Sequence, residues 1–417
     1  MSAKISFGPY TIDVDRHNAE VRDLWQAYRA GDPPRTPIIF GINPRFLLQD
    51  PTINTAGITF REYISNPDVM FDTQLKFQYY VRHHIPQDQE MGLPEACSVH
   101  GYQIPQVQPM GMTGAWSVYV DLQNIYEGAW LGCPVEFPGE NEAPYCIPIL
   151  SDDCRSLLFD RGIPDPFKDG GWMQRNVETY ERLKQRAGNA IFHGSPVSDE
   201  VGLCATGTDG PFTTYCELRG AEKACVDIAL DPEYFHQLME FITEAIVTRI
   251  TAYRRFLGRE IVQETFSFAD DSIELVSTDM YREHILPYHR RLVQTFTAGY
   301  DNSIHLCGDA SRHFKTIKDE LNVLHFDTGF PIDHAAVRDE LGPEVEILGG
   351  PRADLFLGET EALLKETKRI LESDVRAGKK FVLREGNNLA PRSRPENIWQ
   401  FYFHAREWGQ YQGTAQA

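Results

Sequence analysis

The feature of this chain that most constrains its fold is a regular alternation of strand-like and helix-like segments from about residue 231 onward. Short apolar runs typical of buried strands are separated by stretches in which hydrophobic residues recur every three or four positions. Strands that alternate with helices pair in parallel through right-handed crossovers. The predicted strands are 261–268, 302–306, 323–327, 345–349 and 380–383, and the predicted helices are 232–253, 279–298, 311–320, 333–341, 360–377 and one from Glu396.

Three further strands are predicted nearer the N-terminus, at 37–42, near 134–138 and at 202–207. About eight strands in one continuous rhythm favour a (β/α)8 TIM barrel over an open doubly wound sheet. The chain is therefore predicted to form a single α/β domain over residues 1–417. Residues 50–200 are rich in Pro, Gly and aromatic residues, and they are predicted to form long insertions that cap the C-terminal face of the barrel.

The composition excludes some classes of partner. A net charge of −20 over 417 residues argues against nucleic acid and anionic membranes, because attraction to phosphate needs a basic surface. The N-terminus has no apolar segment of signal-peptide length, and no stretch reaches the roughly 18 apolar residues of a membrane span. The eight cysteines do not have the spacing of a disulfide framework. We therefore expect a cytoplasmic protein with reduced thiols.

The barrel prediction also locates the chemistry, because catalytic residues of a TIM barrel lie at the C-terminal ends of its strands. Several polar side chains fall at or just after predicted strand ends, and a closed barrel would bring them together. These candidates are Arg45, Asp270, Asp271, His305, Cys307, Asp327, Arg352, Glu385 and Asn387.

Among these candidates, His305 and Cys307 form the most informative pair, because residues two apart on a strand project from the same face. An imidazole and a thiol on one face form half of a zinc site. Asp327 follows one α/β unit later and is the predicted third ligand. A His, Cys and carboxylate set with one open position is typical of catalytic zinc. The alternative is that the pair are two core residues whose polar groups are satisfied within the protein.

The other candidates are assigned to proton transfer or to substrate binding. Asp270 and Asp271 are predicted to be catalytic, either by transferring protons or by binding the substrate. Their alternative role is to cap the turn that follows them. Glu385, at the end of the last strand, is a third catalytic candidate. An arginine can bind a carboxylate or phosphate bidentately, with a surface ion pair as the alternative. The predicted substrate-binding residues are Arg45, Arg352 and Asn387.

Five segments, in order along the chain, resemble the uroporphyrinogen decarboxylase superfamily, and the likeness is strongest over about 200–409. TGTDGPFTTYCELRG at 206–220 is similar to the Gly-Pro-Phe-Thr turn of the family, and DDSIELVSTDMYREHILPYHRRLV at 270–293 to its Asp-Asp segment with a Pro-containing helix. HLCGDASRHF at 305–314 matches the His-x-Cys-Gly of its zinc-dependent corrinoid methyltransferase branch. GGPRADLFLGE at 349–359 stands where the family has a Gly-Asn-x-Asp-Pro turn, and GNNLAPRSRPENI at 386–398 is similar to its closing Gly-Cys-Gly-x-x-Pro motif.

The resemblance implies a (β/α)8 barrel with a pocket at its C-terminal face and, in the methyltransferase branch, a zinc ion that activates a thiol. It also implies a methyl-corrinoid carried by a partner protein. His305 and Cys307 match the first two zinc ligands of that branch. Asn387 stands in the place of the closing zinc cysteine. This departure implies that Asp327 or Glu385 assists, that the metal differs, or that no metal binds.

The resemblance to true decarboxylases is less complete. Of their N-terminal arginine pair, the segment INPRF at 42–46 retains only Arg45, and their closing Gly-His-Gly reads Gly-Asn-Asn at 386–388. These departures favour the methyltransferase branch over an authentic uroporphyrinogen decarboxylase.

Three functional hypotheses follow. The first is a corrinoid-dependent methyltransferase in which a metal held by His305 and Cys307 activates a small substrate. The second is a metal-independent decarboxylase or lyase in which Arg45 and Arg352 bind the carboxylates of the substrate. The third is a binding or accessory protein built on a barrel that has lost its activity. The resemblance also allows a homodimer.

Overall fold

The computed structural model describes residues 3–94, 114–139, 141–299 and 301–411 of the chain. Its centre is a parallel sheet of five strands in the order β11-β10-β9-β8-β7. Neighbours in this sheet are also neighbours in sequence, as the alternation of strands and helices predicts. The strands are β7 (Ser267–Ala269), β8 (Asn302–Leu306), β9 (Val323–Thr328), β10 (Glu346–Gly349) and β11 (Phe381–Leu383).

Single backbone bridges continue the sheet beyond both of its edges. Ile38 bridges in parallel to Leu383 of β11, so the first predicted strand lies beside the last one. On the other side, the amide of Ala269 donates to the carbonyl of Thr208, and Gly202 bridges to Tyr119. The chain segments around Ile38, Tyr119 and Gly202 therefore continue the wall that β7 to β11 begin.

The prediction that a strand near 134–138 belongs to this wall is wrong. β3 (Val135–Glu136) pairs antiparallel with β4 (Tyr145–Cys146) in a separate two-stranded hairpin. The segment that bridges to Gly202 lies earlier, around Trp116 to Val120, where Trp116, Val118 and Val120 are buried. Its short length and Pro- and Gly-rich surroundings concealed this strand-like segment in the sequence.

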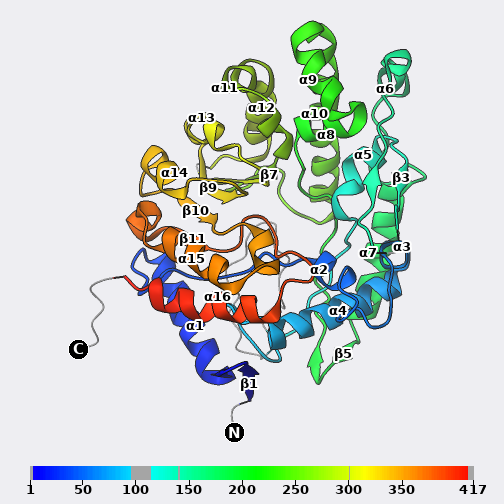
Figure 1. Cartoon of the computed structure of the whole chain (residues 1–417). Coiled ribbons are helices and arrows are strands. Elements are labelled where there is room, and N and C mark those ends of the chain that lie inside the picture. Colours follow the sequence, from blue (N-terminus) through cyan, green and yellow to red (C-terminus); the bar gives the residue numbers. More distant parts are fainter. Residues whose placement is uncertain (1–2, 95–113, 140, 300, 412–417) are drawn as a thin grey trace.

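Helices cover the outside of the sheet, and most of the predicted ones are confirmed (Figure 1). They are α10 (Pro232–Phe256), α13 (Ser311–Leu321), α14 (His334–Leu341), α15 (Thr360–Leu371) and α16 (Pro395–Trp408). The single helix predicted over 279–298 is instead α11 (Thr278–Met280), a π-helical turn (Tyr281–Ile285) and α12 (Leu286–Phe296). Pro287 explains the break, because it has no N–H for the carbonyl of Glu283 and its ring crowds the preceding turn.

Residues 50–200 contain more regular structure than their composition predicts. In Figure 1 their helices gather on the right-hand side of the molecule, beside α8 (Pro211–Arg219) and α9 (Ala221–Leu230). Residues 95–113 of this stretch lie outside the described residues, and the predicted cap stays a prediction. The elements described are α3 (Phe60–Ser65), α4 (Pro67–His84), α5 (Tyr126–Trp130), α6 (Leu157–Arg161), α7 (Trp172–Ala187), β5 (Ile191–Phe192) and β6 (Ser195–Pro196).

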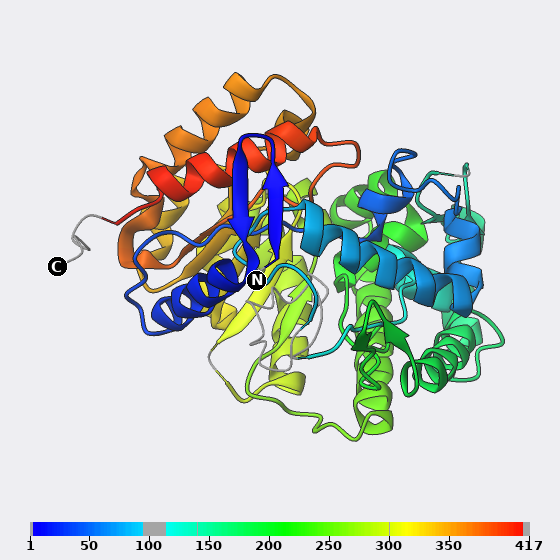
Figure 2. The same cartoon turned by 90° about the horizontal axis from the view of Figure 1, so that it is seen from below.

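The first residues of the chain pack against the last helix. The hairpin of β1 (Lys4–Phe7) and β2 (Tyr10–Asp13) lies beside α16, as Figure 2 shows. The ring of Tyr10 stacks on that of Phe403 at a centroid distance of 4.0 Å. The remaining N-terminal helices are α1 (Val14–Arg29) and α2 (Pro44–Leu48), and α2 begins where the first strand-like segment ends.

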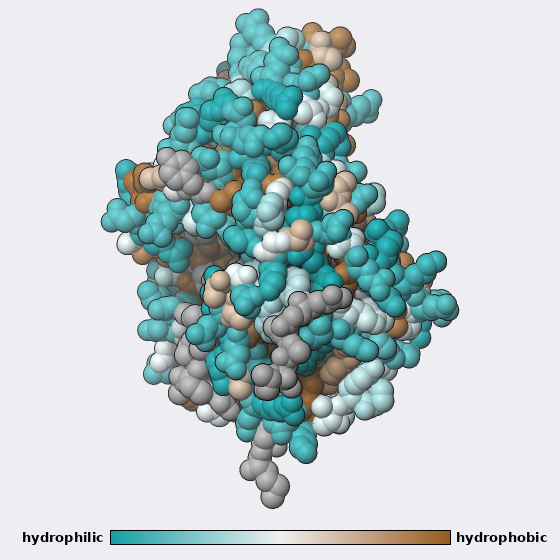
Figure 3. Space-filling model, turned by 90° about the vertical axis from the view of Figure 1, so that its left-hand side faces the viewer, coloured by the Kyte–Doolittle hydropathy of each residue, from teal (hydrophilic) through white to brown (hydrophobic). Residues whose placement is uncertain are grey.

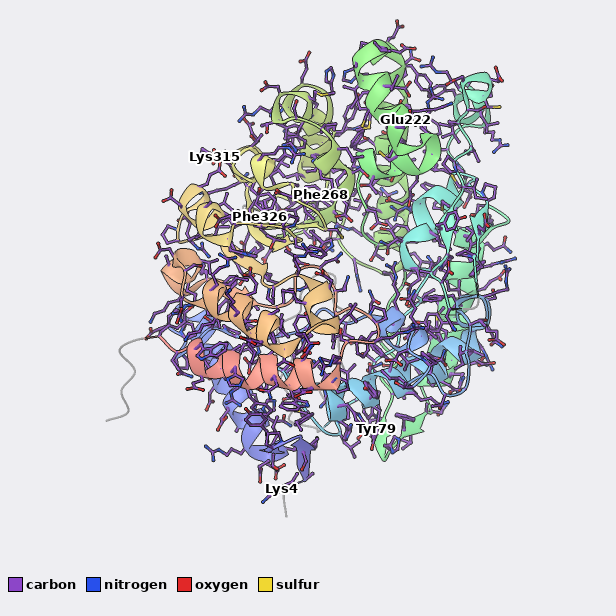
Figure 4. All side chains as sticks on the ribbon, viewed as in Figure 1. Lys4, Tyr79, Glu222, Phe268, Lys315 and Phe326 are labelled. Carbon is purple, nitrogen blue, oxygen red and sulfur yellow. The ribbon has the colours of Figure 1, made fainter. Side chains whose placement is uncertain are left out.

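The hydrophobic core lies between the sheet and its helices. Phe268 and Phe326, labelled in Figure 4, are buried on β7 and β9, whereas Lys315 lies on the outside of α13. The face drawn in Figure 3 is mostly hydrophilic, with hydrophobic residues in small separate patches. Among the described residues, no helix combines the length and the apolar character that crossing a bilayer requires.

Candidate functional site

The candidate site is built where β8 ends. His305 is the fourth residue of β8 and Cys307 directly follows the strand, so their side chains point the same way. The Nε2 atom of His305 lies 3.1 Å from the Sγ atom of Cys307. The predicted common face of these two side chains is therefore confirmed, and the pair meets at the carboxyl end of a central strand.

Asp271 approaches this pair from the neighbouring strand. Ala269 of β7 is in register with His305, so Asp271, two residues beyond Ala269, lies level with Cys307. The backbone amide of Cys307 donates a hydrogen bond of 2.8 Å to Oδ1 of Asp271. One potential ligand atom from each of Asp271, His305 and Cys307 lies within 4.8 Å of the others. The structure thus assembles a compact carboxylate, imidazole and thiol cluster.

Asp327 contacts the same cluster from behind. It is in register with His305 on the next strand, and its Oδ2 atom accepts from Nδ1 of His305 at 2.8 Å. Its other oxygen, Oδ1, accepts a hydrogen bond of 2.7 Å from Nη1 of Arg384. Both oxygens of Asp327 are engaged in these contacts, and Asp271 lies beside His305 and Cys307. Asp327 as the third ligand stays a prediction.

These contacts shape the charges at the site. Burial opposes the imidazolium form of His305, but the Asp327 carboxylate and the Cys307 sulfur outweigh this effect and raise the pKa of His305 well above its usual value. Burial likewise opposes ionisation of Asp327, yet Arg384 and then His305 lower the pKa of Asp327. Asp327 is therefore a fixed negative charge behind His305.

The donor set of the cluster fits zinc. Zinc binds imidazole nitrogen, thiolate sulfur and carboxylate oxygen, and its catalytic sites use three protein ligands and keep one position open. Ligating histidines usually donate their other ring N–H to a carboxylate, which is the contact between His305 and Asp327. Asp271, His305 and Cys307 would hold the ion, with Asp327 fixing the imidazole.

A cavity of about 630 Å³ opens onto the cluster, which is within the usual size range of small-molecule sites. Arg45 lines it, and its guanidinium donates to the side-chain oxygens of Gln123 (2.6 Å) and Asn124 (3.1 Å), which are both uncharged. The predicted site residues among its walls are Arg45, Asp271, His305, Cys307, Asp327 and Asn387. The barrel mouth therefore brings together six of the nine candidates.

Residues 109–408 match the family model of uroporphyrinogen decarboxylase (URO-D), which covers well over half of the chain. The chain belongs to the uroporphyrinogen decarboxylase family. A methylated-thiol–coenzyme M methyltransferase of Methanosarcina mazei is 31% identical over 226 residues, and this alignment covers 54% of our chain and 54% of the relative. The chain thus spans about half the length of the curated relative that it matches.

The fold agrees with this membership. A solved structure described as a methyltransferase from Methanosarcina mazei has a TM-score of 0.57 at 15% identity, and the superposition covers 93% of our chain and 98% of that one. At this identity the likeness shows the fold alone. The URO-D family and this structure imply a TIM barrel, and the strands β7 to β11 form its regular part.

In this URO-D chain, Asp270 has the contacts of a capping residue rather than those of a cavity residue. It is completely buried and accepts hydrogen bonds from the amides of Phe212 (3.0 Å) and Thr213 (2.7 Å) at the start of α8. The Nε2 atom of His289 lies 2.8 Å from its Oδ2 atom. Of the two adjacent carboxylates, Asp271 faces the cavity and Asp270 faces the core, because successive side chains point in opposite directions.

The Asp270→Ala variant is accordingly expected to lose stability without losing metal. Removing one partner of a buried, hydrogen-bonded pair leaves His289 and the two amides unsatisfied, which costs about 3–5 kcal/mol. Urea unfolding of the variant measures this loss, and metal analysis of the folded fraction is the control. Loss of metal at unchanged stability would contradict the capping role.

Arg352 is placed on the surface. Its side chain is 56% exposed and forms a two-pronged ion pair with Asp354, with contacts of 2.8 and 3.0 Å. It does not appear among the residues that line the described cavity. The strand-end rule predicts the position of its backbone but not the direction of its side chain. A substrate-binding role for Arg352 stays a prediction, and its ion pair with Asp354 does not support it.

Glu385 and Asn387 flank the closing turn of the URO-D barrel. Glu385 is completely buried, and its Oε1 atom accepts from the amide of Gly41 (2.8 Å) and from Nη2 of Arg384 (3.2 Å). Asn387 lines the cavity in a left-handed backbone conformation, with a φ of 77°. The side-chain Nδ2 atom of Asn388 donates to its Oδ1 atom at 2.9 Å. Glu385 therefore supports the wall, whereas Asn387 faces the interior.

Glu385 makes the stability of the protein depend on pH. Burial raises the pKa of Glu385 from its ordinary value of 4.5 to about 8, although Arg384 opposes this shift. A carboxyl whose pKa is raised in the folded state stabilises the fold below its unfolded pKa, and this contribution is lost as the pH rises toward 8. The loss is about 1.4 kcal/mol per pH unit between the two values. Urea titrations of wild type and Glu385→Gln at pH 5 and pH 8 should diverge, and parallel curves would contradict the burial effect.

The sequence analysis missed several cavity residues. Arg384 directly follows β11, and Asp209 lies two residues after the predicted strand 202–207, so the strand-end rule applied to every polar residue would have found both. Asp121 follows the segment around Tyr119, which the sequence did not reveal as part of the wall. Long-range pairing, rather than local pattern, places Asp121 in the cavity.

Proposed function

We propose that the chain is a zinc-dependent methyltransferase that moves a methyl group between a small substrate and a corrinoid carried by a partner protein. The cluster of Asp271, His305 and Cys307 at the strand ends of a URO-D barrel carries this proposal. The similarity to a methylated-thiol–coenzyme M methyltransferase supports the reaction class. A cytoplasmic location and a homodimer remain predictions.

The metal cluster has a specific task in this proposal. Asp271, His305 and Cys307 hold zinc, and Asp327 keeps the imidazole of His305 oriented. When bound, zinc supplies Lewis acidity, which favours the deprotonated form of a thiol at neutral pH and polarises an oxygen substituent. A carboxylate in place of a second cysteine makes the donor set harder, which suits oxygen as well as sulfur in the substrate.

The other cavity residues bind the substrate and handle its proton. Among the residues that the structure describes, the hydrogen-bond partners of the Arg45 guanidinium are the uncharged Gln123 and Asn124, so Arg45 offers its positive charge to an acidic group of the substrate. Burial, followed by the neighbouring carboxylates of Glu127 and Asp271, raises the pKa of Asp209. Asp209 lines the cavity, so this carboxyl is suited to take up the proton that a thiol or hydroxyl releases on methylation.

Purified protein with methylcobalamin and a panel of small thiols tests the proposal. We expect a spectral change of the cobalamin that requires both the thiol and zinc bound to the protein, and the reverse reaction with reduced cobalamin and methylated thiols or methoxy compounds. Inactivity of zinc-loaded protein toward the whole panel, in both directions, would contradict it. Free cobalamin stands in for the corrinoid protein in this assay.

The decarboxylase alternative receives less support from the site. The structure does not bring together the arginine pair predicted for it, because Arg45 lines the cavity whereas Arg352 pairs with Asp354 on the surface. Arg254 and Arg259 also line the cavity. Release of carbon dioxide from carboxylated substrates by metal-free protein would favour this alternative over methyl transfer.

A further inference from the structure

We infer that Arg384 is a positioning residue for the metal cluster: it holds Asp327 so that this carboxylate orients His305 with Nε2 facing Cys307 and Asp271. This inference rests on the zinc site of the proposed function. It concerns a residue outside the ligand set, and none of the segments that resemble the family assigns it a role.

The contacts form an unbroken chain across three strands. Arg384 follows β11, has a side-chain exposure of 1%, and donates through Nη1 to Oδ1 of Asp327 at 2.7 Å. Oδ2 of Asp327 lies 2.8 Å from Nδ1 of His305, and Nε2 of His305 lies 3.1 Å from the sulfur of Cys307. Because Arg384 engages one carboxylate oxygen and His305 the other, the plane of the carboxylate is fixed from both sides.

The guanidinium is itself held in place from two directions. Its Nη2 atom donates to Oε1 of Glu385 at 3.2 Å, and the same oxygen accepts from the amide of Gly41 at 2.8 Å. A Cβ atom on Gly41 would lie only 1.9 Å from Nη2 and 2.7 Å from Cζ of Arg384. The absence of a side chain at position 41 is therefore required for this position of Arg384.

A carboxylate partner alone does not distinguish Arg384, because the buried Arg35 pairs with Asp88 outside the cluster. Arg338 provides a comparison with a buried arginine that forms no hydrogen bond to a carboxylate among the residues that the structure describes. Arg338 is also buried, but its guanidinium donates to the backbone carbonyls of Val375, Gly342, Val345 and Lys380. Arg384 instead donates to the carboxyl groups of Asp327 and Glu385, and Asp327 contacts the predicted ligand His305. The connection through Asp327 to His305 distinguishes Arg384 from the other buried arginines, and the variants below test whether it matters for the metal.

The test compares Arg384→Met and Gly41→Ala with the control Arg338→Met in the full-length chain. Gly41→Ala crowds the guanidinium without removing any charged group, and its Cβ would also lie 2.8 Å from the backbone carbonyl of Asn387. Zinc affinity is measured by competition with a chromophoric chelator, and the ligand geometry is followed by the d–d absorption of Co²⁺-substituted protein. We expect zinc affinity to fall about 10- to 100-fold in both Arg384→Met and Gly41→Ala, as for the loss of other groups that orient metal ligands.

The control Arg338→Met should lower the melting temperature while its zinc affinity and cobalt spectrum stay those of wild type. Arg384→Lys, which retains the charge without the planar fork, should recover part of the affinity. Wild-type zinc affinity in both Arg384→Met and Gly41→Ala would overturn the inference, and so would an equal loss in Arg338→Met. A wild-type chain that binds neither metal would overturn the zinc site together with this inference, whereas failure of methyl transfer with normal zinc binding would contradict only the proposed function.

Discussion

Replacing His305 and Cys307 together by alanine is expected to remove zinc from the protein and to abolish methyl transfer. The wild-type chain, purified without added metal, should contain close to one zinc ion, and the double variant should contain only background zinc. Two of the three side chains of the cluster are lost in the variant, and one remaining carboxylate does not hold zinc in a site of this kind. Elemental analysis of both proteins, beside the transfer assay, measures the effect.

A matched control separates loss of ligands from loss of a cysteine. Cys225→Ala removes a thiol from α9, outside the cavity, and should leave the zinc content unchanged. Circular dichroism should show that the double variant is folded. Zinc retained by the folded double variant, or absent from the wild type, would contradict the metal site and turn attention to metal-free chemistry at Arg45.

The second large effect concerns which carboxylate binds the metal. Asp271→Ala is expected to weaken zinc binding by more than about 100-fold, because it removes a ligand, whereas Asp327→Asn is expected to weaken it by about 10- to 100-fold, because it disturbs only the orientation of His305. The reason is geometric: Asp271 lies within the cluster, but both oxygens of Asp327 are engaged by His305 and Arg384.

Chelator competition on the two variants ranks the carboxylates directly. The opposite order, with the larger loss in Asp327→Asn, would restore Asp327 as the ligand and leave Asp271 as a residue that only accepts from the amide of Cys307. Asparagine is used at position 327 because it keeps the shape of the side chain, so that Arg384 is not left beside an empty space.

Much of the barrel could be predicted from local pattern alone. The strand at 302–306 and the helix from Pro232 follow from the two periodicities of hydrophobic residues, and the structure reproduces both. The prediction failed where the hydrophobic pattern was short, or where it fits two kinds of strand equally well. At 134–138, an apolar run fits a local hairpin as well as a barrel strand, and only its antiparallel partner at Tyr145–Cys146 decides between them.

The candidate site shows the same division. The common face of His305 and Cys307 follows from the two-residue repeat of a strand, so the sequence was sufficient for that pair. The choice between Asp270 and Asp271 was not accessible, because both follow the same strand and only the packing of α8 against β7 shows which of them is buried.

By itself, the sequence determined the alternation of strands and helices, the common face of His305 and Cys307, and the strand ends where polar side chains gather. These properties depend on residues close together in the chain. Only the tertiary structure decided that Asp271 lies beside His305 and Cys307, that Arg384 donates a hydrogen bond to Asp327, and that Arg352 pairs on the surface with Asp354. Such outcomes depend on the register between strands and on competition among distant hydrogen-bond partners, and neither is written in any local stretch of sequence.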